Sequence, residues 1–214
     1  MLYCGQYYCR MADSLRKAQP LDSETNESKR LGGETGGEPN KPGEEVILVD
    51  EKDRLVGFET KLAAHQNGGK LHRAFSIFVF DGAGRMLLQR RAEGKYHFGG
   101  QWSNACCSHP RKGEKLEDAA HRRLREEFGF DTEIEEAFSF VYRASDSKSG
   151  LTEHEFDHVF CGEFNGDPHP NADEIADWKW VGLANLEADL QSNPDDYTPW
   201  FRVVVHRVTE DLSA

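Results

Sequence analysis

Paired carboxylates and paired cysteines are the features of this chain whose spacing most directly suggests chemistry. Glu153 and Glu155 lie two apart in TEHEFDHVFCGEF, a β-like segment, so both side chains point to one face and His154 points away. The adjacent Cys106 and Cys107 lie in the extended segment WSNACCSHP and must point to opposite sides, so only one thiol can face a substrate. Two carboxylates on one face are hard oxygen ligands, which suit divalent cations.

A further group of charges lies on the strongest predicted helix, residues 114–128 (EKLEDAAHRRLREEF). Its apolar residues recur at helical spacing, and Gly129 follows as a plausible C-terminal cap. These apolar residues are Leu116, Ala119, Ala120, Leu124 and Phe128. Taken alone, the charges Arg122, Glu126 and Glu127 are also compatible with an ordinary surface helix whose polar face is solvated.

The elements that must position these residues begin near Glu45, where short β-rich runs replace a polar N-terminal segment. Sheet and helix segments then alternate without βαβ regularity, which predicts an α+β fold with a mixed sheet sandwiched between helices. Expected strands are EEVILVD, FSIFVFD, RMLLQRR, TEIEEAFSFVYRA, TEHEFDHVFCGEF and WKWVGL, and expected later helices are LANLEADL and PWFRVVVHRV. Residues 45–214 should form one domain. Residues 1–44 should form a disordered arm, because residues 12–44 are nearly free of large apolar side chains.

Composition excludes several classes of partner. The formal net charge of −12 disfavours nucleic acid and anionic membrane surfaces, although a small anionic substrate can bind where basic residues gather. The five cysteines form neither a CxxC pair nor a disulfide framework, which fits a reduced cytosol. No apolar run is long enough to span a bilayer, and the N-terminus lacks the apolar core of a signal peptide. We therefore expect a cytoplasmic protein, and we expect it to be a monomer.

Several motifs together resemble the type I isopentenyl-diphosphate isomerases of the Nudix superfamily. The helix matches most of the Nudix box, G-x5-E-x7-R-E-U-x-E-E-x-G-U with U aliphatic, although Ser108 replaces the first Gly and Arg123 replaces a Glu. SNACCSHP, two upstream histidines, REEFG, YRA at Tyr142 and TEHE then occur in the family order. The resemblance covers roughly residues 46–205. It implies a Nudix-type fold and interconversion of isopentenyl and dimethylallyl diphosphate in isoprenoid biosynthesis, through a tertiary carbocation.

The resemblance also implies two metal sites. Three imidazoles and two carboxylates match the family's main metal ligands without substitution, and this mixture suits Mn²⁺, Mg²⁺ or Zn²⁺ rather than a soft thiophilic ion. The five residues are His65, His72, His109, Glu153 and Glu155. A second ion, Mg²⁺, is implied at Glu127 and Cys107, where the backbone carbonyl of Cys107 and the substrate diphosphate would add ligands.

Catalytic roles follow from the same resemblance. Cys107 and Glu155 match the two proton-transfer groups, Tyr142 matches a residue that helps Glu155, and Trp200 matches an aromatic ring that stabilises the carbocation. The positions that bind the diphosphate correspond to Lys61, Arg91, Lys95 and Ser108, to which we add Arg123. Because Arg123 replaces a Nudix carboxylate, we expect the protein to hold the diphosphate without cleaving it.

Two alternatives stay open at this point. The Nudix box alone favours a pyrophosphohydrolase that acts on a nucleoside diphosphate derivative, but Arg123 and the Cys/His/Glu set disfavour it. A non-catalytic Nudix module that binds a metal or ligand would show no dependence of any turnover on Cys107.

Overall fold

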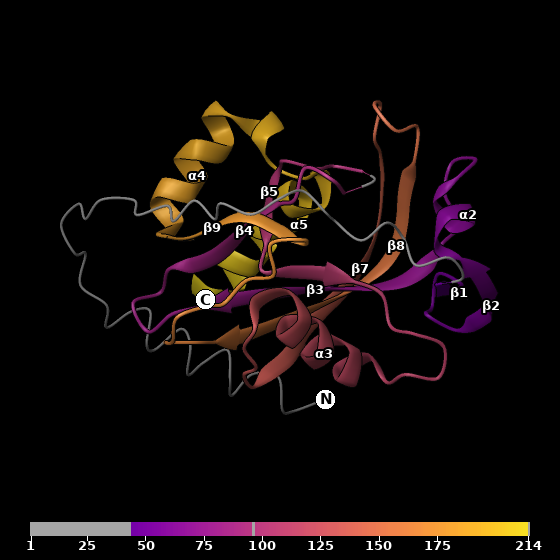
Figure 1. Ribbon diagram of the computed structural model, residues 1–214, viewed down its shortest axis with the longest axis horizontal. Coiled ribbons are helices and arrows are strands. Elements are labelled where there is room, and N and C mark those ends of the chain that lie inside the picture. Colours follow the sequence, from indigo (N-terminus) through magenta and orange to yellow (C-terminus); the bar gives the residue numbers. More distant parts are fainter. Residues whose placement is uncertain (1–43, 96, 214) are drawn as a thin grey trace.

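The computed structural model of this protein describes residues 44–95 and 97–213 (Figure 1). The arm expected over residues 1–44 therefore lies, except for Glu44, outside the described residues. The strands are β1 (Glu45–Val49), β2 (Leu55–Thr60), β3 (His72–Phe80), β4 (Met86–Arg91), β5 (Trp102–Asn104), β6 (Cys106–Ser108), β7 (Ile134–Ser145), β8 (Thr152–Glu163) and β9 (Ile175–Val181). The helices are α2 (Lys61–His65), α3 (Leu116–Phe128), α4 (Leu183–Ser192) and α5 (Pro199–Ser213), with a 3-10 turn η1 (Pro194–Asp196).

Strand β3 forms the centre of one mixed sheet. It runs parallel to β8 along its whole length, from His72 opposite Glu155 to Phe80 opposite Glu163, and antiparallel to β1, β4 and β6. The sheet continues through β2 beside β1, β7 beside β8, and β5 and β9 beside β4. The α+β fold expected from the sequence is thus confirmed.

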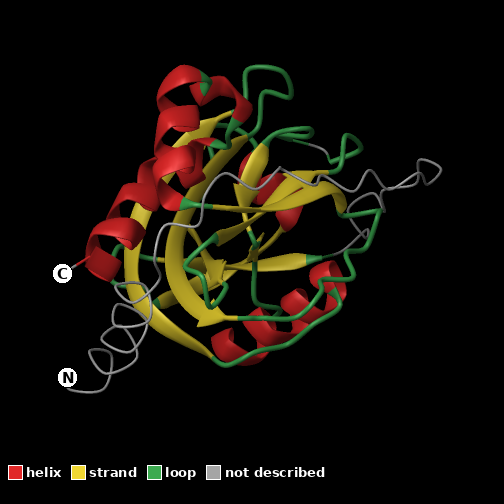
Figure 2. Ribbon diagram, turned by 90° about the vertical axis from the view of Figure 1, so that its left-hand side faces the viewer, coloured by secondary structure: helices red, strands yellow, loops and turns green. Residues whose placement is uncertain are grey.

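Two apolar cores, one on each face of the sheet, explain why the helices pack where they do. Alternate residues of β3 serve opposite faces: Ile77 belongs to the core under α3, whereas Phe78 belongs to the core under α4 and α5. Figure 2 shows the resulting layers, with the curved sheet between α3 on one side and α4 and α5 on the other. Each helix buries its apolar stripe against this sheet.

Helix α3 ends where the sequence predicted, at Phe128, but begins at Leu116, two residues after the predicted start at 114. Ala119, Leu124 and Phe128 are buried, and the chain leaves the helix at Gly129 in the left-handed conformation, with φ of 69°. A Cβ at Gly129 would lie 2.7 Å from the carbonyl oxygen of His169, so both the backbone angle and the close approach require glycine.

Strand β2, helix α2 and the turn η1 were not predicted from the sequence, β5 and β6 were expected only as one extended segment, and β9 differs in its bounds. Strand β2 was missed because its sequence, LVGFET, contains a glycine and no clear alternation. Helix α2 has only five residues, too few for a periodic pattern. Strand β9 was expected at 178–183 but spans Ile175–Val181, and it ends there because Gly182 is the N-cap of α4.

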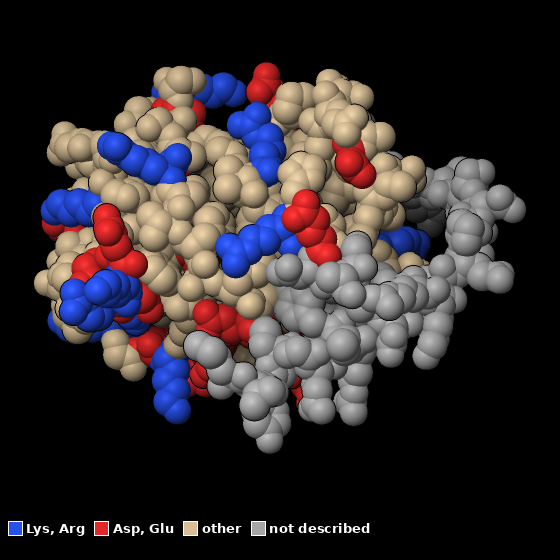
Figure 3. Space-filling model, turned by 180° about the vertical axis from the view of Figure 1, so that it is seen from behind, with Lys and Arg blue, Asp and Glu red and all other residues tan. Residues whose placement is uncertain are grey.

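Two further observations concern the distribution of charge on the surface and the hydropathy of the helices. Figure 3 shows that acidic and basic side chains are interspersed on the face seen from behind, rather than separated by sign. Among the described residues, no helix is both long enough and apolar enough to cross a membrane.

Removing residues 1–43 should change the free energy of unfolding by less than about 1 kcal/mol, because residues 12–43 offer few large apolar side chains to a core. The shortened chain should retain Glu44, whose carbonyl accepts a hydrogen bond of 2.8 Å from the backbone N–H of Lys61. Urea denaturation of both chains measures the difference. A loss of several kcal/mol would show that the N-terminal segment packs on the domain.

Candidate functional site

Strand pairing brings together the five side chains that the sequence analysis assigned to a metal. The parallel register of β3 and β8 sets His72 beside Glu155, and Glu153 lies one same-face position earlier on β8. His65 is the last residue of α2, and His109 directly follows β6. One ligand atom from each of the five residues lies within 4.8 Å of all the others, and four of the five residues are buried. We call this group the His/Glu cluster; it could hold a metal ion.

Hydrogen bonds on the outer side of the cluster orient the imidazole rings. Nδ1 of His65 lies 2.6 Å from the carbonyl oxygen of Lys61, and Nδ1 of His72 lies 2.8 Å from that of Lys70. A carbonyl can only accept, so Nδ1 carries a proton in both rings, and Nε2 is the nitrogen directed inward, which would bind a metal ion in its deprotonated form. Such backbone bonds commonly fix the tautomer of metal-binding histidines.

The inward atoms fit a cation at their centre. Nε2 of His65 lies 2.8 Å from Oε2 of Glu153, and Nε2 of His109 lies 2.8 Å from Oε1 of Glu155. The Nε2 atoms of His72 and His109 are only 3.1 Å apart. Imidazole nitrogens and carboxylate oxygens thus face one another across a buried space, and a divalent ion among them would be contacted by several of these atoms. The donor set therefore fits the metal that the resemblance implies.

Local charge keeps the cluster carboxylates ionised. Burial favours the neutral form of Glu155, as does the charge of Glu153, but hydrogen bonds with His109 and His72 outweigh both and lower the pKa of Glu155. The hydroxyl of Tyr142 donates a hydrogen bond to Oε2 of Glu155, the oxygen that His109 does not contact. Tyr142 is therefore placed directly beside this carboxylate.

The two cysteines of β6 point in opposite directions, as strand alternation predicted. Cys106 is fully buried and its thiol donates to Oε1 of Glu127 at 3.2 Å. The Cys107 thiol lies on the other face, where it donates to Oδ1 of Asn104 at 3.0 Å and lies 3.4 Å from Oγ of Ser76. Burial raises the pKa of Cys107 to about 12, so this thiol is protonated at neutral pH.

The charged residues on α3 and just before it form two groups, which share Glu126 because Arg122 also donates to it, at 3.1 Å. Glu114 forms a bidentate pair with Arg122, at 2.7 and 2.9 Å, so these two Nudix-box positions bind each other. Arg123 donates instead to Glu127 at 2.6 Å and to Glu126 at 2.7 Å, and it lies 3.3 Å from Glu174. The guanidinium at the non-matching Nudix position is thus surrounded by three carboxylates, a set that the sequence analysis did not foresee.

Other basic residues predicted to bind the diphosphate gather around the same place. Lys95 pairs with Glu174, the carboxylate that Arg123 also approaches. Burial lowers the pKa of Lys95 to about 8, and the nearby cations Arg91, Arg123 and Lys61 act in the same direction against the charge of Glu127. Four of the five residues predicted to bind the diphosphate are therefore close enough to interact electrostatically: Lys61, Arg91, Lys95 and Arg123. The fifth, Ser108, lies at the end of β6, where its backbone is paired with Phe75.

Trp200 lies near this group at the start of α5. Its indole N–H donates to Oγ of Ser103 at 3.0 Å, and its ring is 3% exposed. The guanidinium carbon of Arg91 lies 5.3 Å from the ring centroid, and the ring of Phe98 meets the indole edge-on at 5.3 Å. The aromatic ring expected beside the substrate is thus packed against Arg91, Phe98 and Ser103.

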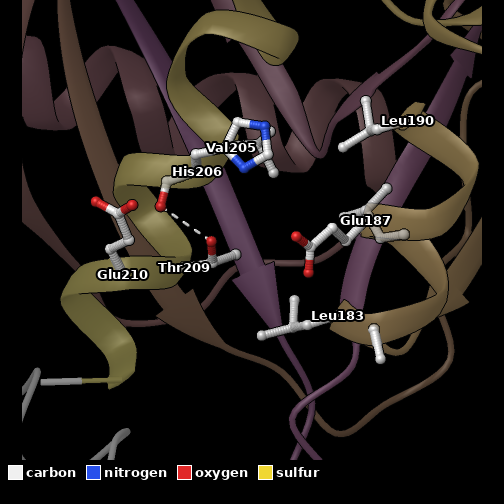
Figure 4. Close-up of a pocket in the computed structure, with 9 residues that line it drawn as sticks. Leu183, Glu187, Leu190, Val205, His206, Thr209 and Glu210 are labelled. Carbon is white, nitrogen blue, oxygen red and sulfur yellow. Dashed lines mark hydrogen bonds between the residues drawn. The ribbon is translucent and has the colours of Figure 1, made fainter.

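A pocket elsewhere on the protein lies between α4 and α5 and has a volume of about 570 Å³ (Figure 4). Leu183, Glu187 and Leu190 approach it from α4, and His206 and Glu210 approach it from α5. None of the predicted site residues lines it. We therefore do not assign it to the chemistry of the His/Glu cluster.

Two buried site residues were missed by the sequence analysis. Asp157 continues the i, i+2 series of Glu153 and Glu155 on β8, so alternation could have found it; its Oδ2 accepts a hydrogen bond of 2.7 Å from Ser76. Burial and the charge of Glu155 raise the pKa of Asp157 well above its usual range. His97 lies in the loop between β4 and β5 and contacts Oε1 of Glu153. No periodic pattern marks a single histidine in a loop.

Comparisons of the sequence with known proteins give matches over more than half of this chain. The family model described as NUDIX domain matches residues 70–201. Isopentenyl-diphosphate Delta-isomerase 2 of Aromatoleum aromaticum is 59% identical over 165 residues, which cover 77% of this chain and 86% of that protein. Isopentenyl-diphosphate Delta-isomerase of Halorhodospira halophila is 49% identical over 163 residues, or 76% of this chain and 93% of that protein.

Solved structures support the fold independently. The crystal structure of DR0079 from Deinococcus radiodurans superposes with a TM-score of 0.57 at 22% identity, covering 70% of this chain and 90% of that one. A MutT protein from Methanosarcina mazei superposes with a TM-score of 0.55 at 19% identity, covering 67% of this chain and 96% of that one. At these identities the likeness concerns the arrangement of sheet and helices alone.

Proposed function

Since this chain belongs to the isopentenyl-diphosphate Delta-isomerases of the Nudix family, we propose that its His/Glu cluster is the catalytic metal site of that reaction. The enzyme interconverts isopentenyl diphosphate and dimethylallyl diphosphate, a step of isoprenoid biosynthesis. One observation carries the proposal. Five residues each offer one potential ligand atom within 4.8 Å of the others, and one of these residues, Glu155, also accepts a hydrogen bond from Tyr142. We propose Mn²⁺, Mg²⁺ or Zn²⁺ as the ion.

The double-bond shift needs two proton-transfer groups. One must add a proton to the terminal carbon, which makes a tertiary carbocation, and the other must remove a proton from the neighbouring carbon. We assign these tasks to Cys107 and Glu155, with Tyr142 assisting Glu155. Because the reaction runs in both directions, the group that acts as acid in one direction acts as base in the other. A metal ion bound in the cluster would hold Glu155 in place and alter its acidity.

The carbocation requires an electron-rich neighbour that is not a nucleophile. We assign this role to the ring of Trp200, since an aromatic face stabilises a desolvated cation by about 2 kcal/mol. The hydrogen bond from the indole to Ser103 and the edge contact with Phe98 hold the ring in one orientation. Such a fixed ring can stabilise charge without reorganising during the reaction.

The diphosphate end of the substrate fits the basic group beside the cluster. We propose that Lys61, Arg91, Lys95, Ser108 and Arg123 bind it, and that Glu127 and the backbone carbonyl of Cys107 hold a Mg²⁺ ion against it. The carboxylates around Arg123 hold its guanidinium in place, which reduces the entropy lost when an anion binds.

The reaction class can be tested by incubating the purified protein with isopentenyl diphosphate and Mg²⁺ or Mn²⁺ in deuterated water. We expect dimethylallyl diphosphate that carries deuterium, because the added proton comes from exchangeable groups. Release of phosphate or pyrophosphate would instead identify a Nudix hydrolase. A protein that binds the metal but turns over nothing would be a non-catalytic module.

Arg123→Glu should lower kcat/KM for isopentenyl diphosphate about tenfold to a hundredfold, mainly by raising KM, because a charge-assisted contact with the diphosphate becomes repulsive. The new carboxylate would also lie among Glu126, Glu127 and Glu174. Steady-state kinetics of the variant and the parent measure the effect.

Arg125→Glu is the matched control for this change. Arg125 lies on the same helix, its side chain is 54% exposed, and its partner is Asp131 rather than a residue of the site. We expect this variant to keep the parental KM. If Arg123→Glu also kept the parental KM, Arg123 would have no part in binding the diphosphate.

A further inference from the structure

His97 contacts the His/Glu cluster without belonging to it. Its Nε2 contacts Oε1 of Glu153, whereas Nε2 of His65 contacts the other oxygen, Oε2, at 2.8 Å. His97 is absent from the group whose ligand atoms lie mutually within 4.8 Å. Glu153 is therefore held at both oxygens, with one directed to the cluster and the other to His97.

Contacts of His97 and of the next residue, Phe98, hold the His97 ring in place. Arg91 donates from Nη2 to the carbonyl oxygen of His97 at 3.3 Å. The next residue, Phe98, has a φ of 50°, an uncommon angle for a residue with a Cβ, and its ring packs edge-on against Trp200 at 5.3 Å. These contacts direct the His97 ring into the interior, where it is 6% exposed. An imidazole placed in this way can restrict the rotation of a neighbouring carboxylate.

We propose that His97 is a positioning residue that orients the metal ligand Glu153 through Oε1 and thereby raises the affinity of the His/Glu cluster for its metal. The inference rests on the proposed metal site. A hydrogen bond to the outer oxygen of a ligating carboxylate restricts its rotation and leaves the inner oxygen available to the ion. Because β8 alternation fixes only the face to which Glu153 points, the rotamer of its carboxylate depends on such a contact.

The test is the affinity of the metal-depleted full chain for Mn²⁺, measured by competition with a chromogenic chelator. His97→Ala should weaken Mn²⁺ binding about tenfold to a hundredfold, the usual effect of removing a group that orients a ligand, without changing the stoichiometry. His97→Gln keeps an N–H near the position of Nε2 and should bind within about threefold of the parent.

His121→Ala is the matched control, because His121 also contacts a carboxylate, that of Asp131 at 2.6 Å, but its side chain is 32% exposed and it does not belong to the His/Glu cluster. Thermal unfolding without metal shows whether each variant is folded. Parental affinity in a folded His97→Ala variant would overturn the inference while leaving the metal site intact. Loss of the bound ion in both His97 variants would make His97 a ligand instead, and absence of Mn²⁺ binding in the parent would overturn the proposed site itself.

Discussion

Replacing Cys107 with alanine should lower turnover of isopentenyl diphosphate by roughly 10³-fold, within the range expected for loss of a positioned proton-transfer group. The Cys107 thiol points to the side of β6 where Ser76 and Asn104 contact it, and burial keeps it protonated. Alanine has no exchangeable proton to give or take. Steady-state kinetics, with deuterium incorporation as a second measurement, tests the expectation.

Cys106→Ala is the control that the strand itself provides. Cys106 lies one residue away but points to the opposite face, where its thiol donates one hydrogen bond to Glu127. Its replacement should cost roughly 1–2 kcal/mol of stability and leave kcat/KM within about tenfold of the parent. Equal losses from both alanine variants would refute the assignment of Cys107.

Cys107→Ser distinguishes acidity from mere position. A hydroxyl can preserve hydrogen bonds to Asn104 and Ser76, but it is a far weaker acid than a thiol. If proton transfer is the role of Cys107, the serine variant should remain within about tenfold of the low alanine value. Recovery of parental turnover would show that the side chain only shapes the pocket.

Glu155→Gln should have an effect at least as large, about 10³-fold or more on turnover, because it removes both a proton-transfer group and a metal ligand. Glu155 accepts the Tyr142 hydroxyl at one oxygen and contacts His109 at the other, at 2.8 Å. An amide presents an N–H where one of these oxygens was and cannot bind a cation through that nitrogen. Mn²⁺ affinity should fall by at least about tenfold.

Measuring turnover and Mn²⁺ affinity together separates the two roles of Glu155. If turnover at saturating Mn²⁺ remains about 10³-fold low, the carboxylate is needed for proton transfer as well as for binding. Glu163→Gln, at the far end of the same strand, should behave like the parent, because Glu163 contacts only Asn165 through its side chain among the described hydrogen bonds. A Glu155→Gln variant that kept a tenth or more of parental turnover would contradict the mechanism.

The local sequence pattern was sufficient to predict the directions in which the side chains of the paired glutamates and the paired cysteines point. Strand alternation predicted that Glu153 and Glu155 share a face and that Cys106 and Cys107 do not, and both are confirmed. The end of α3 before Gly129 followed from helical periodicity and from the need for a left-handed residue, whereas its start, at Leu116, lies two residues after the predicted one. These features depend on neighbours within a few residues, so a single sequence contains the information that they need.

The sequence did not provide the partners that these side chains meet. His65 and Glu153 are 88 residues apart, His97 and Glu153 are 56 apart, and Arg123 meets Glu174 from a separate loop. Family resemblance named the five cluster residues, but neither His97 nor the carboxylates around Arg123 could be inferred from spacing. The parallel register of β3 and β8, which sets His72 beside Glu155, is determined by burial of both cores against the sheet rather than by either strand alone. The sequence therefore determined which groups are available and the face on which each lies, whereas only the tertiary structure decided which of them meet, because those contacts form between segments brought together by packing.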